Sequence, residues 1–239
     1  MIDIHSHVLP GVDDGSQSMD MTKDMLRAAK AAGIQAIVAT PHFRDKDLDK
    51  QRIISVYQSV IPHAQRFGIQ LYLGFEVHYS MLAYLDIQRV ADWCIGGTNV
   101  LLLEFSSSQL PANWDCTISD LVRAGYHPII VHPERYRYVQ KHPELATEMR
   151  GYGCELQLDA EAFTGPFSFW GAQRQVAQKL LRGHLGDYIA SDAHRPSHYK
   201  DFALVHKKLS ARWPEKGWLN NLSKNFNPGA SLFNPGASI

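Results

Sequence analysis

The stretch Ile2-Asp3-Ile4-His5-Ser6-His7, followed by the loop VLPGVDDG over residues 8–15, decides how the rest of the chain is interpreted. Its short apolar start predicts a β-strand over residues 2–5. Side chains alternate between the two faces of an extended segment, so His5 and His7 share one face and can bind one ion together. Asp14 follows in the loop. We therefore expect metal ligands at the carboxyl end of this strand.

Six similar apolar runs follow, and segments with helical spacing separate them. The first such segment has apolar residues at three- and four-residue intervals from Met21 to Ala32, with Ser18 or Asp20 as the amino-terminal cap and Gly33 at the end. Alternating strands and helices predict a parallel sheet covered by helices, closed or nearly closed as a β/α barrel, with a doubly wound open sheet as the alternative. The further strands are expected at 35–39, 70–75, 99–104, 128–131, 155–158 and 188–190, and the further helices at about 47–67, 81–93, 116–125, 142–150, 172–183 and 199–213.

Composition and charge narrow the class of protein. The chain has 239 residues, 24 basic and 24 acidic side chains and 45% hydrophobic residues, which is typical of a folded globular protein and gives no overall positive field for nucleic acid. The first residues do not resemble a secretory signal, and no apolar run reaches the roughly 18–20 residues of a membrane span. The odd number of cysteines, three, without C-x-x-C spacing, indicates neither a disulfide framework nor a thiolate zinc site. We expect a cytoplasmic protein with one domain over residues 1–225 and a repeated Pro-Gly tail over residues 226–239.

Histidine and carboxylate side chains fall at the ends of six of the seven predicted strands. The carboxyl ends of parallel strands open on one face of a barrel, where active sites are built. Four carboxylates crowded there repel one another unless cations lie between them. The candidate metal ligands are His5, His7, Asp14, His42, Glu76, Glu104, His132, Asp192 and His194.

These nine ligands are too many for one ion and suit two or three ions. Imidazole and carboxylate donors without thiolate favour manganese, iron or zinc. The positive charge of such a centre attracts an anion, and we expect a phosphomonoester, attacked by hydroxide held between the ions. Arg135, three residues after His132, is placed to bind two phosphate oxygens.

A cysteine-based tyrosine phosphatase is excluded by spacing. Such an enzyme needs a reactive cysteine with an arginine six residues later. The sixth residues after the three cysteines are Val100, Val122 and Ala160.

Four motifs together resemble a known family. Residues 3–15, Ala39-Thr40-Pro41-His42, His132-Pro133-Glu134-Arg135-Tyr136 and Ser191-Asp192-Ala193-His194 resemble the bacterial capsule and exopolysaccharide tyrosine-protein phosphatases of the PHP (polymerase and histidinol phosphatase) superfamily. The resemblance covers residues 1–225. It implies a distorted seven-stranded β/α barrel, three metal ions, usually manganese, and hydrolysis of phosphotyrosine on an autophosphorylating tyrosine kinase that controls polysaccharide export.

The resemblance also implies how the ligands are shared. His5, His7, Glu76 and Asp192 would hold one ion. Glu76, Glu104 and His132 would hold a second, and Asp14, His42 and His194 a third. Catalytic roles fall on Arg135, His194 and His42. The family's second phosphate-binding arginine has no match after His194, where Arg195 and Lys200 are the candidate substitutes beside Arg135 for substrate binding.

Two other functions remain open. The same site suits a small phosphomonoester of the histidinol phosphate type or a nucleic-acid end, although the neutral net charge weighs against nucleic acid. A silent metal-binding module is a third class, and it predicts metal-dependent stability without hydrolysis. The remaining seven histidines are expected to be structural: His63, His78, His127, His142, His184, His198 and His206.

Overall fold

Strands and helices alternate through the chain, as the apolar spacing predicts. The computed structural model describes residues 1–164 and 171–212, and the predicted tail at 226–239 lies outside them. Every predicted strand overlaps an observed one. The strands are β1 Ile2–Ser6, β2 Ala36–Ala39, β3 His42–Phe43, β4 Gln70–Leu73, β5 Glu76–His78, β6 Val100–Glu104, β7 His127–Val131, β8 Glu155–Asp159 and β9 Tyr188–Ala190.

One predicted strand is followed by an extra one, and another is divided. The segment predicted at 35–39 ends in β2 at Ala39, and the short β3 begins beyond it at His42; the segment predicted at 70–75 ends in β4 at Leu73, and β5 begins beyond it at Glu76. All paired strands are parallel, and they form a three-stranded sheet, β1-β2-β4, and a six-stranded sheet, β3-β5-β6-β7-β8-β9. The described strands therefore form two sheets, and the expected single closed seven-stranded barrel is not observed.

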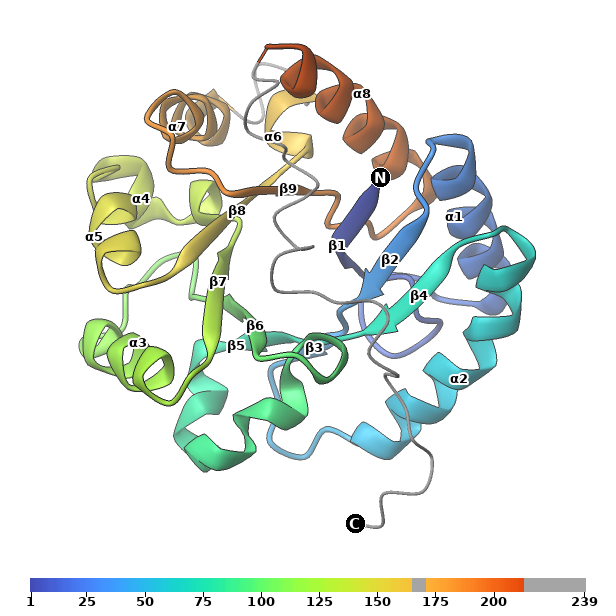
Figure 1. Ribbon diagram of the computed structural model, residues 1–239, viewed down its shortest axis with the longest axis horizontal. Coiled ribbons are helices and arrows are strands. Elements are labelled where there is room, and N and C mark those ends of the chain that lie inside the picture. Colours follow the sequence, from blue (N-terminus) through green and yellow to red (C-terminus); the bar gives the residue numbers. More distant parts are fainter. Residues whose placement is uncertain (165–170, 213–239) are drawn as a thin grey trace.

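The two sheets nevertheless surround a common axis (Figure 1). An isolated parallel bridge joins Ser6, at the end of β1, to Ala193, just after β9. Strand order increases with sequence number within each sheet, without the reversal that a doubly wound sheet has at its switch point. The architecture is a mixed α/β fold with parallel sheets.

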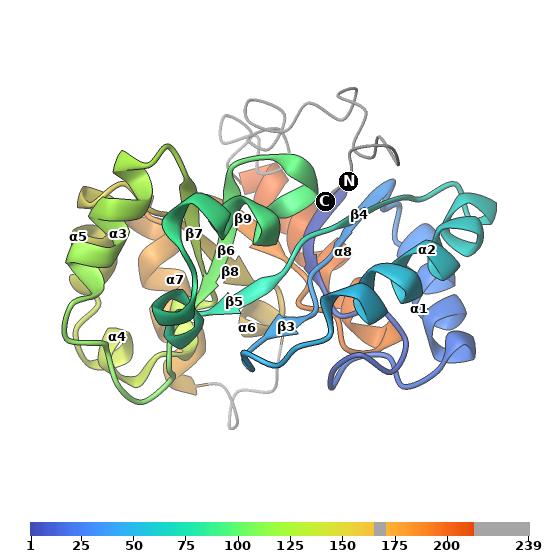
Figure 2. The same cartoon turned by 90° about the horizontal axis from the view of Figure 1, so that it is seen from below.

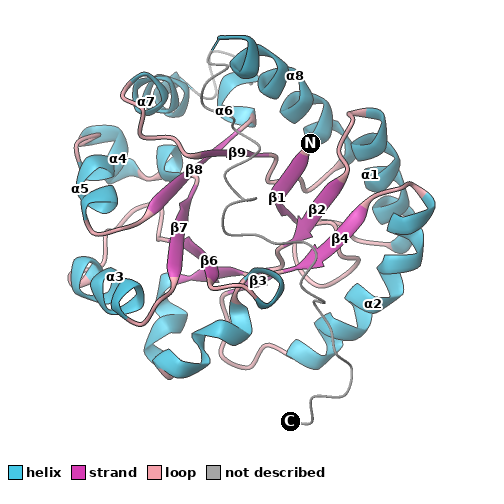
Figure 3. Cartoon of the chain, in the orientation of Figure 1, coloured by secondary structure: helices cyan, strands magenta, loops and turns pink. Residues whose placement is uncertain are grey.

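Helices lie outside the strands, as the secondary-structure colouring in Figure 3 makes plain. In the view of Figure 2, α1 and α2 lie on one side of the strands and α3, α4 and α5 on the other. Ser18 caps α1, because its side chain accepts a hydrogen bond from the Met21 amide. The α-helices are α1 Met19–Ala31, α2 Lys50–Arg66, α3 Trp114–Arg123, α4 Arg137–Lys141, α5 Leu145–Gly151, α6 Glu161–Thr164, α7 Gly171–Arg182 and α8 Pro196–Arg212.

The prediction of an α-helix over residues 81–93 is wrong. Two 3₁₀ segments, η1 Tyr79–Tyr84 and η2 Ile87–Trp93, occupy it, and a third, η3 Ile95–Gly97, follows. The helix predicted at 142–150 is preceded by α4, which lies outside the predicted range. A fourth 3₁₀ turn, η4 Pro133–Arg135, lies directly after β7.

Two apolar clusters use opposite faces of the same strands. Leu101 and Leu103 belong to the cluster that packs against the helices, whereas Leu102 belongs to a second cluster with Ile4 and Tyr72. The second cluster takes residues from both sheets, so the sheets face each other across it. This packing fixes which ends of the strands open together.

The cysteines are free thiols, with Cys94 and Cys154 buried and Cys116 exposed. No disulfide links them. In the described ranges no helix has the length and apolar character needed to cross a membrane.

Candidate metal centre

The structure brings the nine predicted ligands together at the carboxyl ends of the strands. Four of them meet at the centre of the group. The Nε2 atoms of His5 and His7 lie 3.4 and 3.1 Å from Asp192 Oδ1. Both Nε2 atoms also lie 3.5 Å from Glu76 Oε2. Two imidazoles and two carboxylates therefore surround one small volume, which matches the first predicted ligand group.

A second group lies beside the first and includes the loop after β1. Asp14 Oδ1 is 3.0 Å from His42 Nε2 and 3.3 Å from His194 Nε2. One donor atom from each of these residues and from His7 lies within 4.8 Å of the others. The predicted third group is thus present, with His7 at its edge.

The remaining predicted group differs in detail. Glu76, Glu104 and His42 offer donor atoms within 4.8 Å of one another. His132 instead contacts the other Glu76 oxygen, with Nε2 2.8 Å from Oε1. Arg44 also binds Glu104 in a bidentate pair, through Nε at 2.9 Å and Nη2 at 2.7 Å. Glu76 is the carboxylate that all three groups approach.

Several of the converging atoms are buried without a hydrogen-bond partner. They are His42 Nδ1, Glu76 Oε2 and Asp192 Oδ1. Buried polar atoms normally have partners, so a cluster of unpaired donor atoms aimed at one another suits bound cations. The donor set, imidazole and carboxylate without thiolate, fits manganese, iron or zinc. The residues present therefore fit a divalent metal centre.

In the metal-free cluster, histidine and carboxylate side chains shift one another's pKa values. Burial alone would lower the pKa of the His5 imidazole, but the carboxylates of Glu76 and Asp192 raise it to about 9. Burial would raise the pKa values of those carboxyls, but the facing histidines, with Arg135 beside Asp192, hold both pKa values well below the usual range. A protonated His5 thus takes part of the electrostatic role that cations would have.

Hydrogen bonds from outside the group orient the ligand rings. Asp13 Oδ2 lies 2.7 Å from His7 Nδ1, and Gln157 Oε1 lies 2.8 Å from His5 Nδ1. Each bond places the ring proton on Nδ1 and leaves Nε2 free for an ion. Sequence reasoning missed both residues. A polar Gln157 between Leu156 and Leu158, on a fully buried strand, is the signal that could have found it.

The backbone is special where it carries the ligands. His132, directly after β7, and Asp192, two residues after β9, have left-handed φ angles of 36° and 45°. Gly15 is required in the first loop, because a Cβ there would lie 2.2 Å from the His7 carbonyl oxygen. The Gly15 amide also donates to Asp13 Oδ1 at 3.0 Å. The loop is thereby held beside His7.

Of the three predicted substrate-binding residues, only Arg135 lines the pocket at the metal cluster. Arg135 Nη2 lies 2.7 Å from Asp192 Oδ2 and also pairs with Asp159. Arg135 lines a pocket of about 490 Å³ at the metal cluster, with Asp192 and His194. Arg195 instead donates from Nε to His198 Nε2 at 2.7 Å, and Lys200 is exposed on α8. Neither Arg195 nor Lys200 is among the residues that line this pocket.

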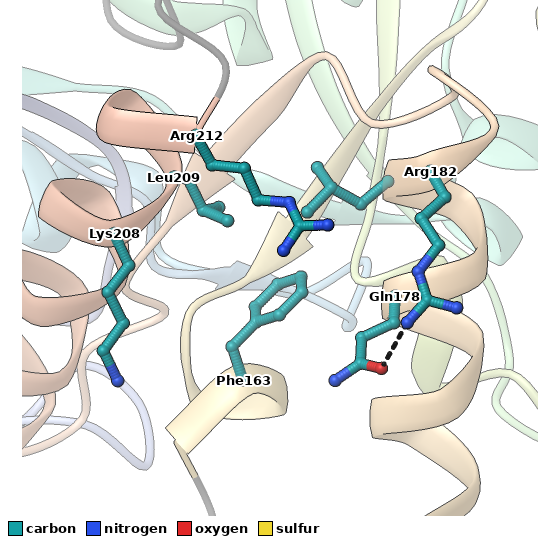
Figure 4. A pocket seen from close by; sticks show the side chains of 7 residues that line it. Phe163, Gln178, Arg182, Lys208, Leu209 and Arg212 are labelled. Atoms are coloured by element: carbon teal, nitrogen blue, oxygen red, sulfur yellow. Dashed lines mark hydrogen bonds between the residues drawn. The ribbon is translucent and has the colours of Figure 1, made fainter.

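A different pocket, of about 320 Å³, lies on the outside of the fold between α6, α7 and α8 (Figure 4). The side chains of Phe163, Gln178 and Arg182 point into it, and Arg182 Nη2 donates to Gln178 Oε1 at 3.3 Å. No candidate metal ligand lines it. The chemistry indicated by the sequence is therefore concentrated at the strand ends.

Comparisons with known proteins show which proteins this chain resembles. The chain is 31% identical to "Putative tyrosine-protein phosphatase CapC" of Staphylococcus aureus, over 92% of this chain and 89% of that protein. It is 30% identical to "Tyrosine-protein phosphatase YwqE" of Bacillus subtilis, over 81% and 77%. It is 26% identical to "Tyrosine-protein phosphatase CpsB" of Streptococcus pneumoniae, over 94% and 97%.

Solved structures extend the comparison. The fold matches one from a study of YwqE from Bacillus subtilis and CpsB from Streptococcus pneumoniae, described as "unique metal-dependent tyrosine phosphatases", with a TM-score of 0.73, 27% identity and 87% of each chain covered. The lactonase Lmo2620 from Listeria monocytogenes shares the fold at a TM-score of 0.53 and 13% identity, over 95% of this chain and 94% of that one. The family model for capsular polysaccharide synthesis, CpsB/CapC, matches residues 1–216, and the chain belongs to that family.

Proposed function

We propose that this protein is a metal-dependent phosphatase that hydrolyses phosphotyrosine on a bacterial tyrosine kinase regulating capsule or exopolysaccharide synthesis. The observation that carries the proposal is the convergence of five imidazoles and four carboxylates, several with unpaired buried donor atoms, at the carboxyl ends of the strands. The relatives named tyrosine-protein phosphatases, and the solved structures described as metal-dependent, support the same activity.

Three divalent ions, preferably manganese, would be held by the nine ligands. His5, His7, Glu76 and Asp192 would bind one, Glu76, Glu104 and His132 a second, and Asp14, His42 and His194 the third. When bound, such ions supply positive charge that stabilises the phosphoryl oxygens and activates water for attack on phosphorus. The short distances from Glu76 to His5, His7 and His132 support a bridging role for this carboxylate.

The chain's own residues bind and orient the substrate. Arg135 lies in the pocket wall, anchored by Asp159 and Asp192, so its remaining guanidinium N–H groups are held in place for a phosphoryl oxygen. His194 lines the same pocket and is placed to give a proton to the leaving phenolate. His42 lies between Asp14 and Glu76, where it would bind one of the ions.

Hydrolysis of a phosphotyrosine peptide, with manganese and after chelation, tests this function. We expect activity that is lost on chelation and on His42→Ala, while His142→Ala, which changes an exposed histidine paired with Glu144, behaves as wild type. Histidinol phosphate and a 5′-phosphorylated oligonucleotide serve as competing substrates. Unchanged turnover after chelation would refute the mechanism, and a higher kcat/KM on either competitor would refute the substrate class.

The finer fold assignment belongs to the same proposal. We infer that the two sheets are parts of one interrupted seven-stranded β/α barrel, because the Ser6–Ala193 bridge joins their ends and one apolar cluster fills the space between them. We also infer a single catalytic domain over residues 1–225, followed by a separate tail at 226–239. The free thiols favour a cytoplasmic location, where a reducing environment keeps cysteines unpaired.

A further inference from the structure

The pocket at the metal centre has a mixed wall of basic and acidic side chains. Its volume is about 490 Å³, and its charged residues come from different elements: Arg135 from η4, Arg137 from α4, Glu161 from α6 and Asp192 from the loop after β9. An incoming phosphorylated segment would pass this wall to reach the ions. Charged groups of the wall that have no partner favour side chains of opposite charge in that segment.

All but one of these charged groups already face an opposite charge. Arg135 pairs with two carboxylates, and Asp192 is one of them. Glu161 Oε1 lies 3.9 Å from Arg195 Nη2. Over the described ranges, 1–164 and 171–212, the Arg137 side chain makes no ion pair and no hydrogen bond. It is the unneutralised cation of this wall.

The backbone holds Arg137 at the edge of the pocket. Its amide donates to the Ser107 carbonyl at 2.8 Å, which ties the start of α4 to the loop after β6. Its side chain is exposed, whereas Arg135 is partly buried and touches the ligand Asp192. Arg135 therefore lies at the depth of the phosphoryl group, and Arg137 lies at the rim.

A phosphotyrosine side chain holds its phosphoryl group and the peptide backbone at opposite ends, and so at different depths of the pocket. When the phosphoryl group reaches the ions, the aromatic ring fills the pocket and the peptide backbone stays at the rim. Side chains of the neighbouring residues then pass the rim cations. A carboxylate there would meet a guanidinium whose charge is offset by no group in the described part of the chain, and the pair would be charge-assisted.

Resting on the phosphatase function proposed above, we propose that Arg137 is a specificity-determining residue that binds an acidic side chain beside the phosphotyrosine of the substrate. Arg195 and Lys200 are candidate substrate-binding residues by sequence, and we assign this contact to Arg137 in their place. Arg195 is engaged by His198 and Glu161, and Lys200 lies on α8 away from the pocket lining.

The test compares three phosphotyrosine peptides that differ only in the neighbouring residue, which is aspartate, asparagine or lysine. With manganese present, we expect wild type to prefer the aspartate peptide over the asparagine peptide by about fivefold in kcat/KM, because exposed charge pairs are modest in strength. The preference should come from a lower KM and not from a higher kcat. Arg137→Gln should remove the preference, Arg137→Lys should keep part of it, and Arg137→Glu should reverse it toward the lysine peptide.

The controls locate the effect. Arg123→Gln changes an exposed arginine on α3 and should leave all three rates unchanged. Raising the salt concentration should shrink the wild-type preference, since screening weakens exposed charge pairs. p-Nitrophenyl phosphate, which has no neighbouring residues, should be affected much less by Arg137→Gln than the aspartate peptide.

Three results would overturn the inference. An equal loss on p-nitrophenyl phosphate and the aspartate peptide would mean that Arg137 contacts the phosphoryl group. Loss of the preference in Arg195→Gln or Lys200→Gln, but not in Arg137→Gln, would assign the role elsewhere. Wild-type hydrolysis without any preference would refute this inference alone, whereas no hydrolysis of any peptide would refute the phosphatase function as well.

Discussion

Single side chains outside the ligand set prepare the metal centre. Asp13 accepts from His7 and, through its other oxygen, from the Gly15 amide, so one carboxylate orients a ligand ring and holds the loop that carries Asp14. Outer residues of this kind typically change metal affinity by roughly 10–100-fold when they are removed. The first motif contains both a ligand and its support, side by side in the sequence.

We predict that Asp13→Ala weakens manganese binding about tenfold. Asp13→Asn should lose less, because its amide oxygen can still accept from His7 Nδ1. Isothermal titration with manganese measures both. Asp20→Ala, at an exposed position in the first turn of α1, is the control. Equal affinities for Asp13→Ala and wild type would show that the hydrogen bond does not position the ring.

The metal-free and metal-bound protein should respond to pH in opposite directions. The His5 pKa rises from about 6.5 in an unfolded chain to about 9 in the fold, so its protonated form stabilises the metal-free protein. That contribution is fully present below about pH 6.5 and is lost as the pH rises through about 9. Metal binding requires neutral imidazole, so manganese affinity should rise over the same range.

Thermal unfolding at pH 6.5 and 9.5 tests both pH dependences, that of metal-free stability and that of manganese binding. In chelator, the melting temperature should be lower at pH 9.5 than at pH 6.5. With saturating manganese, the rise in melting temperature that the metal causes should be larger at pH 9.5 than at pH 6.5. His5→Gln should reduce the pH dependence measured in chelator. A metal-free protein that is as stable at pH 9.5 as at pH 6.5 would contradict the assignment.

At the scale of elements, strand positions were predictable because buried strands of a parallel sheet are nearly continuous apolar runs. The interruptions between β2 and β3 and between β4 and β5 were not, since the second depends on the close packing of Ile95 against Gly74, which the sequence does not reveal. The segment 79–93 has helical spacing, but His78 and Asp86 each accept a hydrogen bond from a backbone amide two residues later. Such local bonds compete with a continuous α-helix.

Gly74 tests the packing explanation for the second interruption. A Cβ at this position would lie 3.0 Å from Ile95 Cγ1 and 3.3 Å from Ile95 Cα, closer than ordinary contact. We predict that Gly74→Ala destabilises the protein by about 1–3 kcal/mol, as overpacking typically does. Gly151→Ala, where no atom lies within 4 Å of the added Cβ, should be neutral or stabilising. Denaturant unfolding compares them, and equal effects would argue against a steric role.

At the scale of the whole molecule, the sequence predicted which strand ends meet but not how the strands pair. The ligands could be found because each follows an apolar run, and parallel strands bring such positions together. The contacts of Gln157 with His5 and of Asp159 with Arg135 could not be predicted, because only the closure of the fold brings these residues together. Arg137 was missed for a similar reason: its neighbours Ser107 and Glu161 are distant in sequence.

The distribution of thiols gives a prediction for the intact fold. Burial raises the pKa of the Cys94 and Cys154 thiols to about 12, whereas Cys116 is exposed. A thiol reagent at pH 8 should therefore modify one cysteine rapidly in the native protein and all three after denaturation. Quantifying released chromophore gives the count, and fast reaction of all three in the native state would contradict the packing.

Cys116 also lies in the first turn of α3, directly after the loop that leaves the metal-facing end of β6. A dye attached to this cysteine would report from the entrance side of the molecule without any engineered mutation. Changes in its emission could then follow the arrival and departure of a phosphorylated partner in real time, one fluorophore per chain.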